Sequence, residues 1–177
     1  MKYAAFLRGI NVGGNKIIKM KELKKIFNSM KLKDIETILQ SGNVLFESTE
    51  KEELLCKKIE TQLQKSLGFE VKIFLRTIPE IEKILKQNPF KQKKLETNEY
   101  IYITFLSGVP EKKLKDSLIA SGNELDIFQI IGREVFAFNL KDEKKKNVFS
   151  NNFVEKILKV SATTRNIQTL NRIVEKQ

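Results

Sequence analysis

The sequence predicts an α+β protein that contains one order of strands and helices twice. Short apolar runs, typical of buried strands, alternate along the 177 residues with segments whose apolar residues recur at helical spacing. The order strand, helix, strand, strand, helix, strand fits the first half, and most of it fits the second half. Hydrophobic content of 41% and charged content of 31% are those of a chain that folds around a proper core.

The first half has the clearest pattern. Leu23, Ile26, Phe27 and Met30 follow the helical spacing i, i+3, i+4, i+7, whereas residues 69–76 alternate as a strand does. A capping box at Thr49–Glu52 opens the second helix, and Gly68 closes it. The predicted elements are strands at residues 3–8, 35–39, 44–46 and 69–76, with helices at residues 19–30 and 49–67.

The second half begins after a linking helix, which a second capping box at Thr77–Glu80 starts and Asn88-Pro89 ends. Its predicted elements are a strand at residues 100–106, a helix after Pro110, strands at 125–130 and 135–140 around a Gly132-Arg133 turn, and helices at 150–158 and 166–176. Both halves then match ferredoxin-like βαββαβ units in an α/β sandwich, with mainly antiparallel sheets and an extra C-terminal helix. The predicted organisation is a first half at 1–77, a link at 78–98 and a second half at 99–177.

Composition excludes several chemistries. The chain has no histidine and one cysteine, Cys56, which falls in a helical pattern, so a Cys/His zinc site and a histidine base are both absent. We therefore expect no metal and no cofactor, and no catalytic residue can be named. Carboxylates at Glu36, Glu47, Glu70 and Asp126 lie on predicted strands, opposite apolar faces, where we expect them to be solvent-exposed.

The net charge of +11 raises nucleic acid as a partner. However, all but five of the 33 basic residues are lysines spread over every helix, a usage that biased codon composition also produces. The arginines are more informative, because a guanidinium group binds planar anions in a bidentate way. Arg8 and Arg165 stand out among them.

A glycine-rich loop from Arg8 to Lys16 is the best candidate site. In a βαββαβ unit the end of the first strand and the turn between strands two and three lie at the same edge, so this loop should meet Gln40–Asn43. Backbone N–H groups, amides and one guanidinium there suit a phosphate or carboxylate. The candidate ligand-binding residues of this edge are Arg8, Gly9, Asn11, Gly13, Gly14, Gln40, Ser41 and Asn43.

Standard phosphate and RNA motifs do not match. The run from Gly9 to Lys16 has an extra residue before the lysine, and Ile17 stands where a P-loop needs Ser or Thr. A G-x-G-x-x-G interpretation also fails. The third strand offers only Phe46, so the paired aromatics of an RNA-recognition sheet are missing.

Four segments carry a family resemblance: Tyr3–Gly14, Lys19–Leu23, Leu39–Phe46 and Ala162–Asn166. In this order they resemble the bacterial family called domain of unknown function 1697. The resemblance implies a duplicated ferredoxin-like fold with no established activity, and it adds Thr164, Arg165 and Asn166 to the candidate binding residues. Thr164 would cap the last helix. The sequence departs from the family at Ile167, where a Trp is usual, and at Lys146–Phe149.

The leading hypothesis is a binding module for an anionic, phosphate-bearing ligand, a nucleotide or nucleic-acid phosphate, at the glycine-rich loop. One alternative is a structural or protein-interaction domain in which the loop braces the fold, with Asn11 and Asn43 bonded to local backbone. Another is an enzyme that uses neither His nor Cys. No apolar run reaches the roughly 18 residues of a membrane span, and the N-terminus lacks a signal-peptide pattern, so we expect a cytoplasmic protein with no membrane partner. The oligomeric state stays open.

Overall fold

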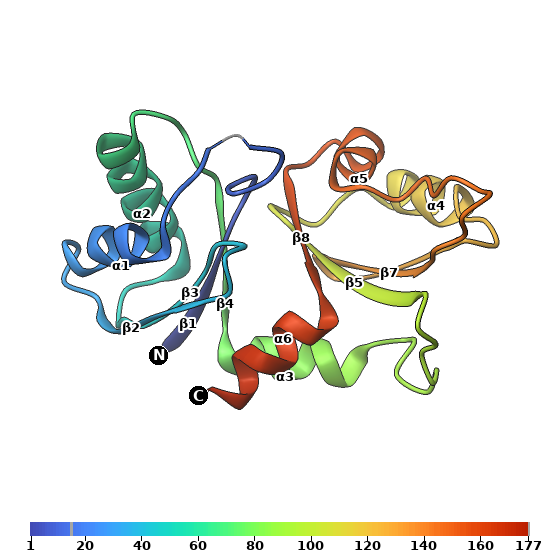
Figure 1. The fold of residues 1–177 in the computed structure, drawn as a ribbon, viewed down its shortest axis with the longest axis horizontal. Helices are drawn as coiled ribbons and strands as arrows, with labels where there is room; N and C mark the ends of the chain where they lie inside the picture. Colours follow the sequence, from blue (N-terminus) through green and yellow to red (C-terminus); the bar gives the residue numbers. More distant parts are fainter. Residues whose placement is uncertain (15, 177) are drawn as a thin grey trace. The chain divides into compact units, whose positions relative to one another are not determined.

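The computed structural model describes residues 1–14 and 16–176 and contains two compact units. Unit 1 comprises Met1–Ile81 and Ile173–Gln177, and unit 2 comprises Glu82–Arg172. Each unit holds one four-stranded antiparallel sheet (Figure 1). The α+β fold with two ferredoxin-like repeats is therefore confirmed.

Unit 1 has the strand order β2-β3-β1-β4, with β1 in the interior of the sheet. Its elements are β1 (Lys2–Leu7), α1 (Met20–Asn28), β2 (Lys33–Ile38), β3 (Asn43–Glu47), α2 (Glu52–Leu67) and β4 (Ile73–Thr77). Helices α1 and α2 cover one face of this sheet (Figure 1). Leu23 and Phe27 of α1 and Leu55 and Ile59 of α2 are fully buried there, as their spacing predicts.

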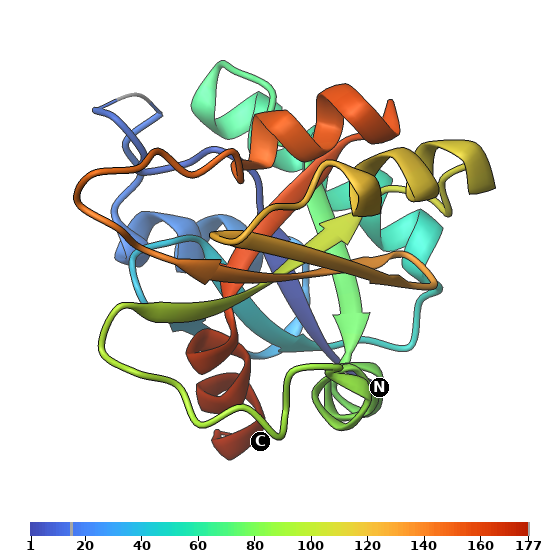
Figure 2. The same cartoon turned by 90° about the vertical axis from the view of Figure 1, so that its right-hand side faces the viewer.

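Unit 2 repeats the arrangement with the order β6-β7-β5-β8. Its elements are β5 (Glu99–Leu106), α4 (Lys112–Ala120), β6 (Asp126–Ile131), β7 (Glu134–Leu140), α5 (Asn151–Leu158) and β8 (Ala162–Asn166). Helices α4 and α5 lie on one face of this sheet (Figure 2). The predicted hairpin at Gly132-Arg133 joins β6 to β7.

Each repeat ends in a strand that leads directly into a helix. Strand β4 is followed by α3 (Ile78–Gln87), and β8 by α6 (Ile167–Glu175). At the first junction, Glu80 Oε2 accepts the Thr77 N–H at 2.7 Å and the Glu80 N–H donates to Thr77 Oγ1 at 3.4 Å, so the predicted capping box is confirmed. At the second, the Gln168 N–H donates to Asn166 Oδ1 at 2.8 Å.

Strand β8 corrects the prediction for the C-terminal segment. Residues 162–166 are mostly polar and show no apolar alternation, so the sequence does not predict a strand there. All five residues nevertheless pair with β5. Thr164 and Arg165 therefore belong to a strand, and Asn166 rather than Thr164 caps the last helix. The missing sixth element of the second repeat is thus present.

The capping box predicted at Thr49–Glu52 is wrong. Helix α2 begins at Glu52 with Lys51 as its N-cap and has no side-chain capping bond. Ser48 Oγ instead accepts the Glu50 N–H at 3.1 Å, which folds the preceding residues into a turn of their own.

The two repeats share backbone contacts as well as order. In unit 1, the Leu7 N–H donates to Gly42 O at 2.9 Å and the Arg8 N–H to Lys72 O at 2.8 Å. In unit 2, the corresponding donors are Leu106, to Arg133 O, and Ser107, to Ser161 O, both at 2.9 Å. Arg8 and Ser107 are therefore equivalent positions. Across the described residues, no helix has both the length and the apolar character needed to cross a bilayer.

Candidate functional site

The glycine-rich loop and the β2–β3 turn meet at one edge of unit 1, as the topology predicts. The Leu7 N–H reaches Gly42 O at 2.9 Å, and Asn11 Nδ2 donates to Gln40 O at 2.8 Å. This edge joins segments that are separated by about 30 residues in sequence because the first helix returns the chain between them.

Asn11 holds the base of the loop together. Its Oδ1 accepts the Ile18 N–H at 2.8 Å, and its Nδ2 donates to Ile18 O at 3.0 Å as well as to Gln40 O. The side chain thus takes the place of a neighbouring strand for Ile18, whose side chain is buried. Both polar atoms of Asn11 are engaged within the protein, so its role in the fold is structural.

Asn43 and Ser41 form a second internal cluster in the turn. Asn43 is fully buried, and its Nδ2 donates to Ile38 O at 2.9 Å and to Ser41 Oγ at 3.0 Å. Gly42, which is not among the candidate ligand-binding residues, is the constrained position of this turn. A Cβ on Gly42 would lie 2.4 Å from Ile10 Cδ1, and its φ is +75°. Asn43 therefore holds this turn together through hydrogen bonds, and Gly42 is required because a side chain there would clash with Ile10.

The loop glycines are different, because they face open space. Gly9, Gly13 and Gly14 all have positive φ values and are exposed, and a Cβ on any of them would meet nothing within 4 Å. Their conformation requires glycine, whereas their surroundings do not. A loop of this kind leaves backbone groups open to a ligand.

Lys16 and Arg8 anchor the two ends of the loop. Lys16 Nζ donates to Glu70 O at 2.7 Å and lies 5.3 Å from the centre of the Phe69 ring. Arg8 is half-buried, and its N–H continues the pairing of β1 with the segment before β4. Lys19, by contrast, is exposed and immediately precedes α1.

A hollow of about 430 Å³ opens between the loop, the start of α1 and the β2–β3 turn. Its lining residues are Asn11, Gly14, Ile17, Ile18, Lys19, Met20 and Gln40. The two segments that form this edge, residues 8–21 and 37–46, contain no Asp or Glu, although the chain has 22 of them. Only the folded structure brings these two segments together. The lack of Asp and Glu in either segment by itself is therefore only a weak indication of an anion site.

The remaining candidate residues lie in unit 2. Thr164 Oγ1 is 2.8 Å from Thr104 Oγ1 and donates to Asn151 Oδ1 at 3.1 Å. Arg165 Nη1 donates to Thr163 Oγ1 at 2.9 Å and to Thr164 O at 2.8 Å. Burial lowers the pKa of Arg165 to about 10, which leaves it charged at neutral pH. A ligand contact for Thr164, Arg165 and Asn166 stays a prediction.

Asp126 is the clearest error in the sequence interpretation, because its carboxylate is buried rather than solvent-exposed. It accepts from Asn139 Nδ2 at 2.7 Å, Asn147 Nδ2 at 3.1 Å, the Val148 N–H at 2.7 Å and the Phe149 N–H at 3.3 Å. The donors come from β7 and from the segment before α5, which the strand pattern could not reveal. Asp126 fixes that segment in place.

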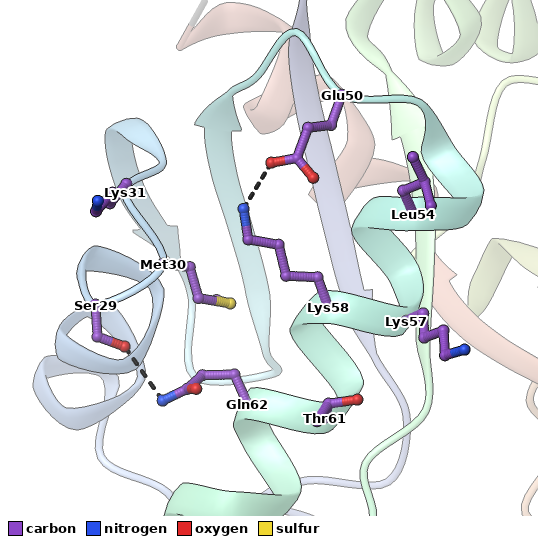
Figure 3. Close-up of a pocket in the computed structure, with 9 residues that line it drawn as sticks. All are labelled: Ser29, Met30, Lys31, Glu50, Leu54, Lys57, Lys58, Thr61 and Gln62. Carbon is purple, nitrogen blue, oxygen red and sulfur yellow. Dashed lines mark hydrogen bonds and ion pairs between the residues drawn. The ribbon is translucent and has the colours of Figure 1, made fainter.

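A larger hollow, of about 670 Å³, lies between the end of α1 and α2 (Figure 3). The Lys58 Nζ to Glu50 Oε1 ion pair spans 2.6 Å beside it, and Gln62 Nε2 donates to Ser29 Oγ at 3.3 Å (Figure 3). Three lysines, Lys31, Lys57 and Lys58, and one carboxylate, Glu50, line this hollow, and the C-terminus of α1 adds a partial negative charge.

The fold and the glycine-loop hollow define a duplicated ferredoxin-like α+β protein with an open hollow whose lining residues include no carboxylate. The chain belongs to the family described as "Protein of unknown function (DUF1697)", whose model matches residues 1–136. The resemblance seen in the sequence is thereby confirmed, although Ala162–Asn166 lies beyond the matched residues.

Comparison with solved structures identifies a full-length likeness. The conserved bacterial protein SP0830 from Streptococcus pneumoniae aligns with a TM-score of 0.75 at 22% identity, over 98% of this chain and 97% of that protein. At this identity the likeness establishes the fold. No curated protein matches the chain.

Proposed function

We propose that unit 1 binds a phosphate-bearing anion, a nucleotide or a nucleic-acid phosphate, in the hollow beside the glycine-rich loop. The carrying observation is the charge of this edge: Lys19 lines the hollow, and the segments 8–21 and 37–46 that surround it contain no carboxylate. A volume of about 430 Å³ falls in the range of small-molecule sites.

Lys19 has the position of a ligand-binding cation. It is the N-cap of α1, where a positive side chain is unfavourable because the helix dipole places partial positive charge at the same end. A bound anion would relieve that repulsion. Gly14, which also lines the hollow, supplies close backbone approach, whereas Arg8 lies at the base of the loop and does not line the hollow.

The test is titration of nucleotides and short oligonucleotides at low salt, followed by calorimetry, with three variants. Lys19→Ala should weaken binding about tenfold, the loss of one charge-assisted hydrogen bond, and Arg8→Ala should weaken it less, because Arg8 does not line the hollow. Lys21→Ala is the matched control, because Lys21 is exposed on the same helix but does not line the hollow.

The salt dependence of the affinity distinguishes a nucleic acid from a mononucleotide as the ligand. Affinity for an oligonucleotide should fall steeply as salt rises, whereas affinity for a mononucleotide should change little. Absence of binding at low salt, or equal weakening by Lys19→Ala and Lys21→Ala, would contradict the proposal.

A structural or interaction role is the second candidate, and the three internal hydrogen bonds of Asn11 favour it. On this view the loop braces the fold and holds no ligand. Arg8→Ala and Gly13→Ala would then lower the free energy of unfolding by about 1–3 kcal/mol without affecting any nucleotide titration. An enzyme that uses neither His nor Cys would require a reacting group, and among the residues that line the hollow only Lys19 could supply one.

A further inference from the structure

Two lysine-rich segments of unit 2 meet at one end of its sheet. Residues 91–98 precede β5 and residues 141–147 follow β7, and the antiparallel pairing of these two strands brings the segments together (Figure 2). The Lys141 N–H donates to Asn98 O at 2.8 Å, and Asn98 Nδ2 donates to Lys141 O at 3.1 Å. The two segments are here called the lysine edge.

The lysine edge is much richer in lysine than the chain as a whole. Its 15 residues contain seven lysines and three carboxylates, whereas the 177 residues of the chain contain 28 lysines. A codon bias that spreads lysine over every helix does not concentrate it in two segments that meet only after folding. All seven side chains are exposed, and they are Lys91, Lys93, Lys94, Lys141, Lys144, Lys145 and Lys146.

Most of these positive charges are not neutralised by carboxylates. Lys93 Nζ lies 3.2 Å from Glu99 Oε1, and Lys145 forms an ion pair with Glu124. Within the part of the chain that the structure describes, the other five lysines of the edge form no ion pair. Like charges held close together repel one another, so a polyanion that binds there relieves the repulsion.

Aromatic rings hold two of the lysines in place. Lys141 Nζ lies 4.6 Å from the centre of the Tyr100 ring, and Lys93 Nζ lies 4.1 Å from the centre of the Phe138 ring. A cation that already rests on a ring loses less conformational freedom on binding than a mobile lysine does. The lysine edge is therefore partly ordered before a ligand arrives.

Three half-buried rings lie in a row beside these cations. Tyr100 stacks on Tyr102 with 6.2 Å between ring centres, and Tyr102 lies 5.3 Å from Phe149. Tyr102 is equivalent to Tyr3 of unit 1, since each lies four residues before the end of its strand. Tyr3 is only 3% exposed. Unit 2 thus keeps ring surface accessible at a position that unit 1 buries.

We propose that the lysine edge and these rings bind single-stranded nucleic acid, with the lysines on phosphates and the rings against unpaired bases. Proteins that bind single strands combine a basic surface with aromatic rings on which bases stack, and a base can stack in this way only when it is unpaired. The net charge of +11 favours the approach of any polyanion. This surface is separate from the hollow of unit 1 and does not depend on the function proposed for that hollow.

The experiment is fluorescence anisotropy of a labelled single strand of about twelve nucleotides, at about 50 to 200 mM salt. The double variant Lys144→Gln/Lys146→Gln should weaken binding about tenfold. It should also reduce the slope of log affinity against log salt by about 1.4, because two phosphate contacts are lost. Nucleotide titration at the hollow of unit 1 should stay as in the wild type.

The matched control is Lys112→Gln/Lys113→Gln, which removes the same net charge. Both lysines are exposed at the start of α4, which follows the opposite end of β5. The control should change the affinity by less than about twofold, because exposed charges beyond a Debye length are screened. All four substituted lysines are exposed, so both double variants should keep the wild-type circular dichroism and melting temperature.

Substitutions at Tyr100 test the stacking. Tyr100→Leu should weaken single-strand binding at least about fivefold with an unchanged salt slope, because it removes a ring and no charge. Tyr100→Phe keeps the ring and should bind as the wild type does. A duplex of the same length should bind more weakly than the single strand.

Four results would overturn the proposal. They are absence of single-strand binding at about 50 mM salt, equal weakening by the two double variants, a Tyr100→Leu variant that binds as tightly as the wild type, and displacement of the strand by polyglutamate as effectively as by unlabelled oligonucleotide. The second would reduce the effect to net charge, and the last would assign the lysine edge to an acidic protein.

Discussion

The first strand of each unit leads into its helix by a very different route. In unit 1 the connection runs from Arg8 to Lys19, contains three glycines with positive φ, and ends in an open hollow. In unit 2 the equivalent connection is only Ser107 to Glu111. The flanking backbone bonds, from Leu7 and Arg8 in one unit and from Leu106 and Ser107 in the other, are the same.

This difference distinguishes what the fold requires from what the candidate site adds to it. The βαββαβ order closes with a five-residue connection in unit 2, so the longer glycine-rich loop of unit 1 is not needed to form the fold. The N-caps of the two helices also differ in charge. Glu111 precedes α4, where an acidic residue is favourable, whereas the basic Lys19 precedes α1. Lys51 precedes α2 too, with Glu52 and Glu53 in the first turn, whereas the first turn of α1 holds one acidic residue, Glu22.

The largest expected effect lies at the first residue of β6. Asp126→Ala removes an acceptor of four hydrogen bonds and leaves buried donors unsatisfied, so the free energy of unfolding should fall by about 3 kcal/mol or more. The first residue of β2, Lys33, is exposed, and Lys33→Ala should change stability by less than about 0.5 kcal/mol. Urea denaturation measures both, and equal losses would show that the buried carboxylate is not what distinguishes the two strands.

The turns that follow β2 and β6 should differ next. Gly42→Ala combines positive φ with a clash against Ile10, for an expected loss of about 2–4 kcal/mol. Gly132→Ala in unit 2 has positive φ alone, since its nearest neighbour would be Glu134 Oε2 at 3.6 Å, and should cost about 1 kcal/mol. The comparison fails if denaturation gives the two variants the same stability.

A third prediction concerns the loop itself. Asn11→Ala leaves the backbone of Ile18 without its side-chain partner and should lower the free energy of unfolding by about 1–3 kcal/mol. Val12→Ala is the control, because Val12 lies in the same loop and is 67% exposed. A stability loss as large in Val12→Ala would mean that the loop contributes through apolar contacts instead.

The last prediction is a gain in stability, at Lys19. Lys19→Asp introduces a good N-cap with a favourable charge, so the free energy of unfolding should rise by about 0.5–1 kcal/mol. Urea denaturation measures this gain. Phosphate binding should weaken at the same time, because the cation is lost. A variant that is more stable and still binds nucleotide as well as the wild type would remove Lys19 from the site.

Much of the fold was predictable because it rests on local patterns. The helical spacing of Leu23, Ile26 and Phe27 marks a buried helix face, and Gly132-Arg133 marks a hairpin between two apolar runs. The capping box at Thr77 succeeded, whereas the same pattern at Thr49 failed because Ser48 forms a competing turn. Local motifs are thus reliable only where no neighbouring side chain competes for the same backbone group.

Other features depend on partners that are distant in sequence. Strand β8 is polar and becomes a strand because β5 offers it a free edge, and Asp126 is buried because Asn139, Asn147 and the backbone after it converge on its carboxylate. The convergence of the loop with Gln40–Asn43 was predictable from topology, but the hollow was not. Its existence depends on side-chain positions that no periodicity encodes.

The sequence by itself therefore determined the family, the duplicated α+β fold and the edge at which the glycine-rich loop lies, because apolar spacing and turn residues act locally. The tertiary structure alone decided that Asn11 and Asn43 serve the fold, that Lys19 faces a hollow without carboxylates, and that the lysines of residues 91–98 and 141–147 meet at one end of a sheet. Hydrogen bonds and charges act through space, so their balance is set only when distant segments come together.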